Sequence, residues 1–337
     1  MMRITVLASG SKGNSTVVAS SKTQILVDAG LSCRELLKRM ATAGEDPCAL
    51  NAILITHEHQ DHVNGLAVLG RKLGIPVFFT EATHRAWVRQ LTPRTTMSYA
   101  QWLDQRKQQQ EAASMASAEP INPGIDIETL CAEAEEEVAA AEAASESAAS
   151  LCEDPDAAAP AKVSIRDNPS YLPALEFFKP GTNFCIGDID VTPFTIPHDA
   201  ADPCGFVFES EGVRMAIATD LGYMPPNVKQ AIRNCDVLML ESNHDLEMLR
   251  DGPYPWSVKQ RVLSRVGHLS NVAAADFLAK DYDGGAAYVI LAHLSESNNM
   301  PELARVAAEE AIGNRMRLLG NKILLAQQST PLQPLCL

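Results

Sequence analysis

The chain reads Ile53-Leu-Ile-Thr-His-Glu-His-Gln-Asp-His62 where a short apolar run leads into a cluster of potential metal ligands. The apolar run predicts a buried β-strand, and the ligands that follow it are His57, His59, Asp61 and His62. Three of the eight histidines of the chain lie in this stretch. Unligated histidines this close together would repel one another on protonation. Because imidazole and carboxylate ligands suit Zn²⁺, Mn²⁺ or Fe, the stretch predicts a metal site at the end of a strand.

Strand-like and helix-like patterns alternate on both sides of this stretch. Apolar runs bounded by Gly, Ser and Asn predict strands at 3–8, 15–20, 24–28 and near 323–327. Apolar residues at helical spacing predict helices over 62–73, 81–91 and 301–313. This alternation is typical of α/β proteins.

At least five apolar strands end in a histidine or an acidic residue. The residues at these ends are His57, His198, Asp220, Glu241 and His293. Layered α/β proteins place their sites at the ends of buried strands. One such histidine alone would more often be structural, but five similar strand ends predict a single shared site.

The polar residues of this site are numerous enough for two metal ions. One group is His57, His59 and His198, a second is Asp61, His62 and His293, and Asp220 could bridge the two. Ions that share a carboxylate lie roughly 3.5–4 Å apart, and such a pair deprotonates a water held between them, which makes it the nucleophile. The expected cofactors are two divalent ions, Zn²⁺ or Mn²⁺ with Fe as a third candidate. A cavity of this kind suits an anionic phosphodiester.

Further residues are expected to act on the substrate. Glu241 and His268 can form a carboxylate–imidazole pair that protonates the leaving alkoxide. Asp61 is counted with them as catalytic as well as a metal ligand. Candidate substrate contacts are Ser11, Asn14, His244, Ser295, Asn298 and Asn299. A tight hairpin connection is the alternative for the loop that holds Ser11 and Asn14, and a structural role is the alternative for His244.

Composition places the chain among globular proteins. It has 337 residues, of which 46% are hydrophobic, and no apolar run reaches the roughly 18 residues of a membrane span. Residues 1–10 resemble a strand and are too short in their apolar part for a signal peptide. The eight cysteines include no C-x-x-C pair, which favours free thiols in a reducing compartment. We therefore expect a cytoplasmic protein.

The net charge of −14 is concentrated in one segment. Residues 111–160 contain 13 Asp and Glu residues and no Lys or Arg, so the rest of the chain is close to neutral. Around this segment, Ala-Glu repeats replace apolar periodicity and leave no face to bury. We interpret 104–163 as a low-complexity surface insertion, disordered or transiently helical, between the two halves of one domain, 1–103 and 164–330.

The order His57-x-His59-x-Asp61-His62, followed by His198, Asp220 and His293, resembles that of the metallo-β-lactamase superfamily. Local sequences are similar to those of its YycJ/WalJ-type branch. They are Gly10-Ser-Lys-Gly-Asn-Ser15, Pro197-His-Asp-Ala-Ala-Asp202, Ala218-Thr-Asp-Leu-Gly222, Glu241-Ser-Asn-His-Asp245, Gly267-His-Leu-Ser-Asn271 and His293-Leu-Ser-x-x-Asn-Asn299. The resemblance covers about 1–100 and 164–330, which is all but the acidic insertion.

The resemblance implies an αββα sandwich, in which two mixed β-sheets are flanked by helices, with two metal ions. It also implies a 5′→3′ exonuclease activity with DNA as the partner. Glu241 and His268 resemble the pair that tRNA 3′-processing relatives use near the leaving group.

Two other functions are compatible with the same residues. The metals could hydrolyse a small ester, thioester, lactam or cyclic nucleotide. Alternatively, the domain could be a non-catalytic, metal-stabilised module that binds a partner through the acidic insertion. The residues by themselves do not distinguish DNA from RNA, one cleavage polarity from the other, or a monomer from an oligomer.

Overall fold

The computed structural model of the chain describes residues 1–92, 103, 106–107, 168–313 and 322–337. The two sheets and their helices belong to one compact unit formed by residues 1–92 and 165–337. The predicted insertion over 104–163 lies outside the described residues, apart from residues 106 and 107. Among the described residues, no helix is both long and apolar enough to cross a membrane.

The first sheet has seven strands in the order β14-β1-β2-β3-β4-β5-β6. They are β1 (Arg3–Ala8), β2 (Ser15–Ala19), β3 (Gln24–Val27), β4 (Ala52–Leu54), β5 (Val77–Phe79), β6 (Leu175–Phe177) and β14 (Leu335–Cys336). The strands from β14 to β3 pair antiparallel, and those from β3 to β6 run parallel. The three strands predicted near the N-terminus are confirmed to within one residue.

The second sheet also has seven strands, in the order β13-β12-β11-β10-β9-β8-β7. They are β7 (Phe184–Ile186), β8 (Ile189–Thr195), β9 (Cys204–Ser210), β10 (Val213–Ala218), β11 (Val237–Glu241), β12 (Tyr288–Ala292) and β13 (Lys322–Leu325). The strands from β7 to β10 pair antiparallel, and those from β10 to β13 run parallel. Every residue of β11 is buried, because both faces of the parallel part are covered.

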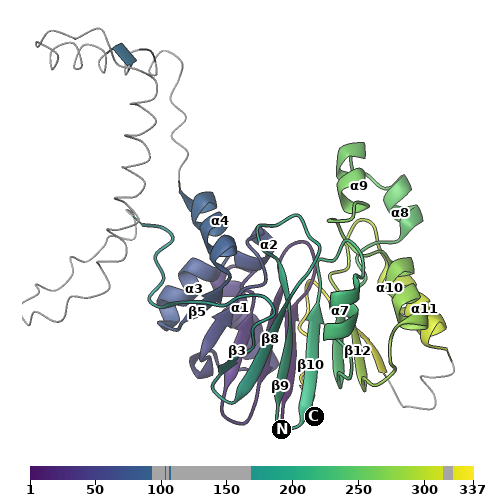
Figure 1. Cartoon of the computed structure of the whole chain (residues 1–337), viewed down its shortest axis with the longest axis horizontal. Helices are drawn as coiled ribbons and strands as arrows, with labels where there is room; N and C mark the ends of the chain where they lie inside the picture. The colour runs from purple at the N-terminus through teal and green to yellow at the C-terminus, as the bar shows by residue number, and fades with distance from the viewer. Residues whose placement is uncertain (93–102, 104–105, 108–167, 314–321) are drawn as a thin grey trace, which may run out of the picture. The chain divides into compact units, whose positions relative to one another are not determined.

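The helices lie outside the two sheets (Figure 1). They are α1 (Cys33–Ala43), the 3₁₀ turn η1 (Pro47–Ala49), α2 (Gln60–Val63), α3 (Leu66–Leu73), α4 (Glu81–Leu91), α7 (Pro226–Ala231), α8 (Leu246–Asp251), α9 (Trp256–Val262), α10 (Asn271–Lys280) and α11 (Pro301–Ile312). The helices predicted over 81–91 and 301–313 correspond to α4 and α11.

Three hydrophobic cores hold these layers together. The central core lies between the sheets, where Ile4 of β1 belongs to the same cluster as Phe206 of β9. A second core joins the first sheet to α1, α3 and α4, with Trp87 among its largest side chains. A third joins the second sheet to α7, α10 and α11 and includes Phe277. The αββα sandwich of two mixed sheets is therefore confirmed.

One predicted helix is wrong in its extent. The helix expected from His62 to Leu73 is two helices, α2 and α3, separated at Asn64 and Gly65. Gly65 donates its N–H to the carbonyl of Ala29 at 2.8 Å instead of continuing α2. A Cβ atom at Gly65 would lie 2.2 Å from the carbonyl oxygen of Leu31, so only glycine permits this approach. The break lets the His-rich segment pack against the end of β3.

Candidate metal centre and active-site cavity

Strand ends from both sheets converge on one site. His57 follows β4 and His198 follows β8, whereas Asp220, Glu241 and His293 come from the ends of β10, β11 and β12. Asp220 and His293 have φ angles of 61° and 56°. Residues other than glycine are uncommon in this left-handed region and persist there only when the surroundings fix them. The backbone is thus held in a sparsely populated conformation where it presents these side chains.

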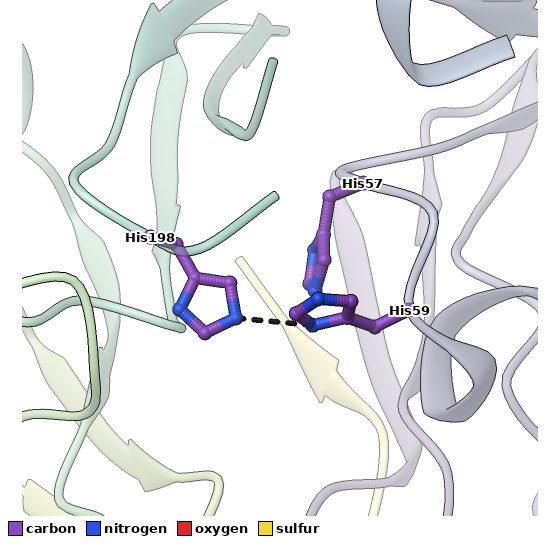
Figure 2. Close-up of side chains that lie close together, drawn as sticks. All are labelled: His57, His59 and His198. Atoms are coloured by element: carbon purple, nitrogen blue, oxygen red, sulfur yellow. Dashed lines mark hydrogen bonds between the residues drawn. The ribbon is translucent and has the colours of Figure 1, made fainter. Parts of the chain in front are cut away.

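His57, His59 and His198 form the first group of candidate ligands. Their ligand atoms lie within 4.8 Å of one another. Figure 2 shows His57 and His59 on one loop and His198 facing them from another part of the chain. Nδ1 of His59 lies 3.2 Å from Nε2 of His198. The structure therefore brings together three residues that the sequence predicts as one ligand set.

The hydrogen bonds of His59 and His198 indicate which of their nitrogen atoms face the site. Nε2 of His59 lies 3.2 Å from the carbonyl oxygen of Asp199, and Nδ1 of His198 lies 3.2 Å from that of Gly267. These nitrogens must carry the protons, because a carbonyl only accepts. When both rings are neutral, the facing nitrogens, His59 Nδ1 and His198 Nε2, both present lone pairs. Two lone pairs at 3.2 Å repel unless a cation lies between them.

Asp61, His62 and His293 form the second group, again with ligand atoms within 4.8 Å of one another. Oδ2 of Asp61 lies 3.5 Å from Nε2 of His62 and 3.5 Å from Nε2 of His293. Asp220 stands between the groups, since it is 3.5 Å from Nε2 of His62 and 4.0 Å from Nε2 of His198. This is the position that the sequence predicts for a bridging carboxylate.

The donor set fits divalent metal ions. Nε2 of His57, Nε2 of His293 and Oδ2 of Asp220 are buried and have no hydrogen-bond partner among the described residues. Buried polar atoms are almost always partnered, so three such atoms facing one site require an explanation. Burial and the neighbouring His62 and His198 hold the pKa of His57 well below its usual range. His57 is therefore neutral, which is the form that binds a metal.

Two buried carboxylates orient two of the candidate ligands, His62 and His293. Oδ2 of Asp28 lies 2.7 Å from Nδ1 of His62, and Asp28 in turn accepts hydrogen bonds from the backbone N–H and hydroxyl of Thr56. Oε1 of Glu241 lies 2.9 Å from Nδ1 of His293. Carboxylates in these positions fix the tautomer and increase the basicity of the nitrogen that faces the metal.

Glu241 also pairs with His268, as the sequence predicts. Its Oε1 lies 2.8 Å from Nδ1 of His268, and its Oε2 accepts the N–H groups of Leu221 and Leu269 at 2.6 and 3.2 Å. Burial alone would raise the pKa of Glu241, but His268 and His293 outweigh it and leave the pKa well below its usual range. Glu241 is ionised, so only His268 of this pair can carry a proton to the substrate.

An open cavity of about 640 Å³ lies over the two groups. Asp61, Asp220, His268 and His293 line its inner part. One wall comes from α2 and α4, and its lining residues are Gln60, Val63, Asn64, Trp87, Gln90 and Leu91. Arg261 on α9 lines the cavity as well and forms an ion pair with Asp199. Sequence patterns did not single out Trp87, Arg261 or Asp28.

The predicted substrate contacts divide into three kinds. Ser11 lines the cavity. Asn14 is buried, and its Nδ2 lies 3.2 Å from Oδ2 of Asp61 and 3.0 Å from Nε2 of His62, so it holds two candidate ligands in place. His244 is buried and does not appear among the described residues that line the cavity.

The remaining three, Ser295, Asn298 and Asn299, are also absent from the described lining of the cavity. Nδ2 of Asn299 instead donates to the carbonyls of Ser242 and Asn243 at 2.9 and 3.0 Å. The hydroxyl of Ser295 accepts the N–H of Asn298 at 3.2 Å. These residues stabilise the loops that follow β11 and β12, and their predicted contact with substrate remains a prediction.

Sequence comparisons place this geometry in a known family. Residues 8–128 match the metallo-beta-lactamase superfamily, and residues 125–294 match a beta-lactamase superfamily domain. The exodeoxyribonuclease YycJ of Bacillus anthracis is 31% identical over 311 residues, which cover 92% of this chain and 89% of the relative. The exodeoxyribonuclease WalJ of Streptococcus pneumoniae serotype 2 is 30% identical over 309 residues, or 90% of this chain and 86% of the relative.

A comparison of structures agrees at the level of the fold. The metallo-β-lactamase fold protein YhfI from Bacillus subtilis superposes with a TM-score of 0.58 and 13% identity, over 98% of this chain and 99% of that protein.

Proposed function

Because the chain belongs to the metallo-β-lactamase superfamily, and to its YycJ/WalJ-type branch, we propose that it is a metal-dependent exonuclease that degrades DNA from the 5′ end. The observation that carries this proposal is the pair of ligand groups on either side of Asp220, which opens into a cavity with His268 in its wall. The named activity of the relatives, exodeoxyribonuclease, supports DNA as the substrate.

The proposed cofactors are two divalent ions, Zn²⁺ or Mn²⁺, with Fe as a third candidate. His57, His59 and His198 would hold one ion, Asp61, His62 and His293 the other, and Asp220 would contact both. Divalent ions in such positions make water nucleophilic at neutral pH and neutralise charge on a phosphate.

Side chains of the protein supply the rest of the chemistry, namely proton donation and phosphate recognition. Glu241 accepts a hydrogen bond from Nδ1 of His268, which leaves Nε2 of that ring as its free nitrogen. His268 lines the cavity, so Nε2 can donate a proton to the oxygen that leaves when the phosphodiester is cleaved. Arg261 in the cavity wall supplies a guanidinium that recognises phosphate oxygens. Asn14 and Asp28 act as positioning residues, because they contact His62 and are not among the described residues that line the cavity.

The size of the cavity is compatible with part of a nucleic-acid strand as its occupant. Its volume of about 640 Å³ falls in the range of roughly 300–1,000 Å³ that is usual for small-molecule pockets, and the cavity is open to solvent.

The proposal is tested with DNA and RNA strands labelled at the 5′ or the 3′ end, incubated with metal-loaded protein. We expect stepwise release of the label from the 5′ end of DNA and no release in the Asp220→Ala variant. Release from RNA alone would contradict DNA as the substrate, and release from the 3′ end would contradict the polarity. Turnover of small esters without any nucleic-acid cleavage would contradict the nuclease assignment.

A further inference from the structure

Residues 254–266 form a short ridge at the border of the cavity. One residue of this ridge, Arg261, lines the cavity wall. It contains α9, which stands at the same end of the sheets as α2 and α4 and opposite the two termini (Figure 1). All seven residues of α9 are described, and none of them is buried. A helix this short is not stable alone, so contacts at its ends must hold it while its outer face stays free.

Backbone contacts fix the ridge to the metal centre. Val266 accepts the N–H of Asp199 at 3.1 Å, and Val262 accepts the N–H of His268 at 3.0 Å. The carbonyl of Gly267, which follows the ridge, orients His198. The loop after Asp220 also packs closely on the ridge, since a Cβ atom at Gly222 would lie 2.1 Å from the carbonyl oxygen of Arg265. The position of the ridge is therefore set by the residues around the candidate ligands.

The charge of the ridge differs from that of the chain. Residues 252–268 contain Lys259, Arg261 and Arg265 and no acidic residue, in a chain with a net charge of −14. The side chain of Arg261 is 62% exposed. The guanidinium of Arg265 lies 4.5 Å from the centre of the Tyr223 ring, which holds it at the surface. A local excess of cations beside a hydrolytic cavity is complementary to a polyanion.

The ridge also carries an aromatic platform. Trp256 is 66% exposed, more than any other aromatic side chain among the described residues. It lies five positions before Arg261, or about 7.5 Å along the helix axis at about 1.5 Å per residue. Exposed aromatic rings beside basic residues are the surfaces on which unpaired bases stack.

We propose that this ridge binds the single-stranded part of a nucleic-acid substrate whose terminal phosphodiester lies at the metal centre. Arg261 and Arg265 contact phosphates of this strand, and Trp256 stacks on an unpaired base outside the cavity. A paired duplex keeps its bases stacked on one another and cannot offer them to Trp256. The proposal rests on the proposed nuclease function and adds the form of the substrate and the residues that select it.

The first test separates binding along the ridge from chemistry at the metals. KM and kcat are measured for a 5′-labelled oligothymidine and for bis(p-nitrophenyl) phosphate, which is too short to extend from the cavity to Trp256. We expect Trp256→Ala to raise KM for the oligonucleotide by about 5- to 100-fold, the effect of losing one stacked base. The Trp256→Phe variant should keep most of the stacking, so its KM for the oligonucleotide should be close to that of the unmodified protein. Tyr171→Ala, which removes another exposed aromatic ring, should leave KM unchanged.

A second test concerns the phosphate contacts. Binding of the oligothymidine is measured over a range of salt concentrations without cleavage. Removing one phosphate contact lowers the slope of log Kd against log salt by about 0.7 for a single strand, so Arg265→Gln should show this change. The matched control is Lys280→Gln on α10, a cation that is 68% exposed and pairs with Asp276. Its slope should equal that of the unmodified protein.

Two results would overturn the ridge proposal. The first is an oligonucleotide KM and Kd that Trp256→Ala leaves unchanged. The second is a dimer that Trp256→Ala converts to a monomer in sedimentation, because the ridge would then be an interface between copies of the chain. A protein that cleaves bis(p-nitrophenyl) phosphate but no nucleic acid would contradict the nuclease function instead, and the binding measurements alone would then decide on the ridge.

Discussion

Oδ2 of Asp28 lies 2.7 Å from Nδ1 of His62, and this buried pair connects β3 of the first sheet to the candidate metal centre. Asp28 has a φ angle of 61°, and Thr56 donates a hydrogen bond to each of its carboxylate oxygens. The carboxylate is thus held before any metal binds. Because it accepts the Nδ1 proton of His62, it leaves Nε2 of that ring as the candidate metal ligand.

Replacing Asp28 by Asn should weaken metal binding at the second ligand group. Loss of a carboxylate behind a ligating histidine typically lowers metal affinity by about 10- to 100-fold. Competition with a chelator, followed by metal analysis, measures the effect. The control is Asp276→Asn at an exposed surface carboxylate, which should not change the affinity. Equal affinity in both variants would show that Asp28 does not support His62.

Replacing His268 by Gln should slow cleavage of DNA without loss of metal. General acid catalysis contributes about 100- to 10,000-fold to a rate, and kcat for DNA should fall by a factor in this range. A p-nitrophenyl ester has a leaving group that does not need a proton, so its kcat should change little. Equal losses with both substrates, or a reduced metal content, would place His268 among the ligands instead.

His244 should make the protein less stable in acid. Burial lowers the pKa of His244 from 6.5 to about 4, so the unfolded chain binds a proton in this pH interval that the folded chain does not. The unfolding free energy therefore decreases as pH falls from 6.5 to 4, by about 3 kcal/mol in total. Urea unfolding of metal-free protein at several pH values measures the slope. His244→Asn should flatten it, and an unchanged slope would contradict this role.

Replacing Gly30 by Ala should disturb the site through the backbone. A Cβ atom at Gly30 would lie 1.7 Å from the carbonyl oxygen of Asp61 and 2.6 Å from the backbone nitrogen of Asn14. Relief of this overlap must move the His-rich segment, and overpacking of this kind costs about 1–3 kcal/mol. Thermal unfolding and metal titration should both show a loss. Gly285→Ala is the control, because its nearest neighbour atom is 3.5 Å away.

The sequence alone identified candidate residues where the signal comes from neighbouring positions in the chain. The segment from His57 to His62 carries four candidate ligands on one loop, and each further candidate follows an apolar strand. The same patterns missed Asp28 and Arg261, because their roles depend on contacts with His62 and Asp199 that only the tertiary fold creates. A charged residue at the end of a strand looks the same in the sequence whether it binds a metal or supports another residue.

The predicted helix over 62–73 failed for a related reason. Apolar residues continue at helical spacing through Gly65, and a single glycine does not end a helix by its propensity alone. The close approach of Leu31 to Gly65 is a tertiary contact that the local sequence does not encode. The hydrogen bonds that Ser295 and Asn299 make to neighbouring loops are likewise contacts that the local sequence does not encode.

The central claim, a two-metal centre shared by the two sheets, is tested most directly by the metal content of the purified, reconstituted chain. Mass spectrometry of the metals should find two divalent ions per chain, and fewer than two in both His59→Ala and Asp220→Ala, with circular dichroism unchanged. DNA cleavage should be lost in both variants. A chain that binds one ion or none and still cleaves DNA at the full rate would contradict the account.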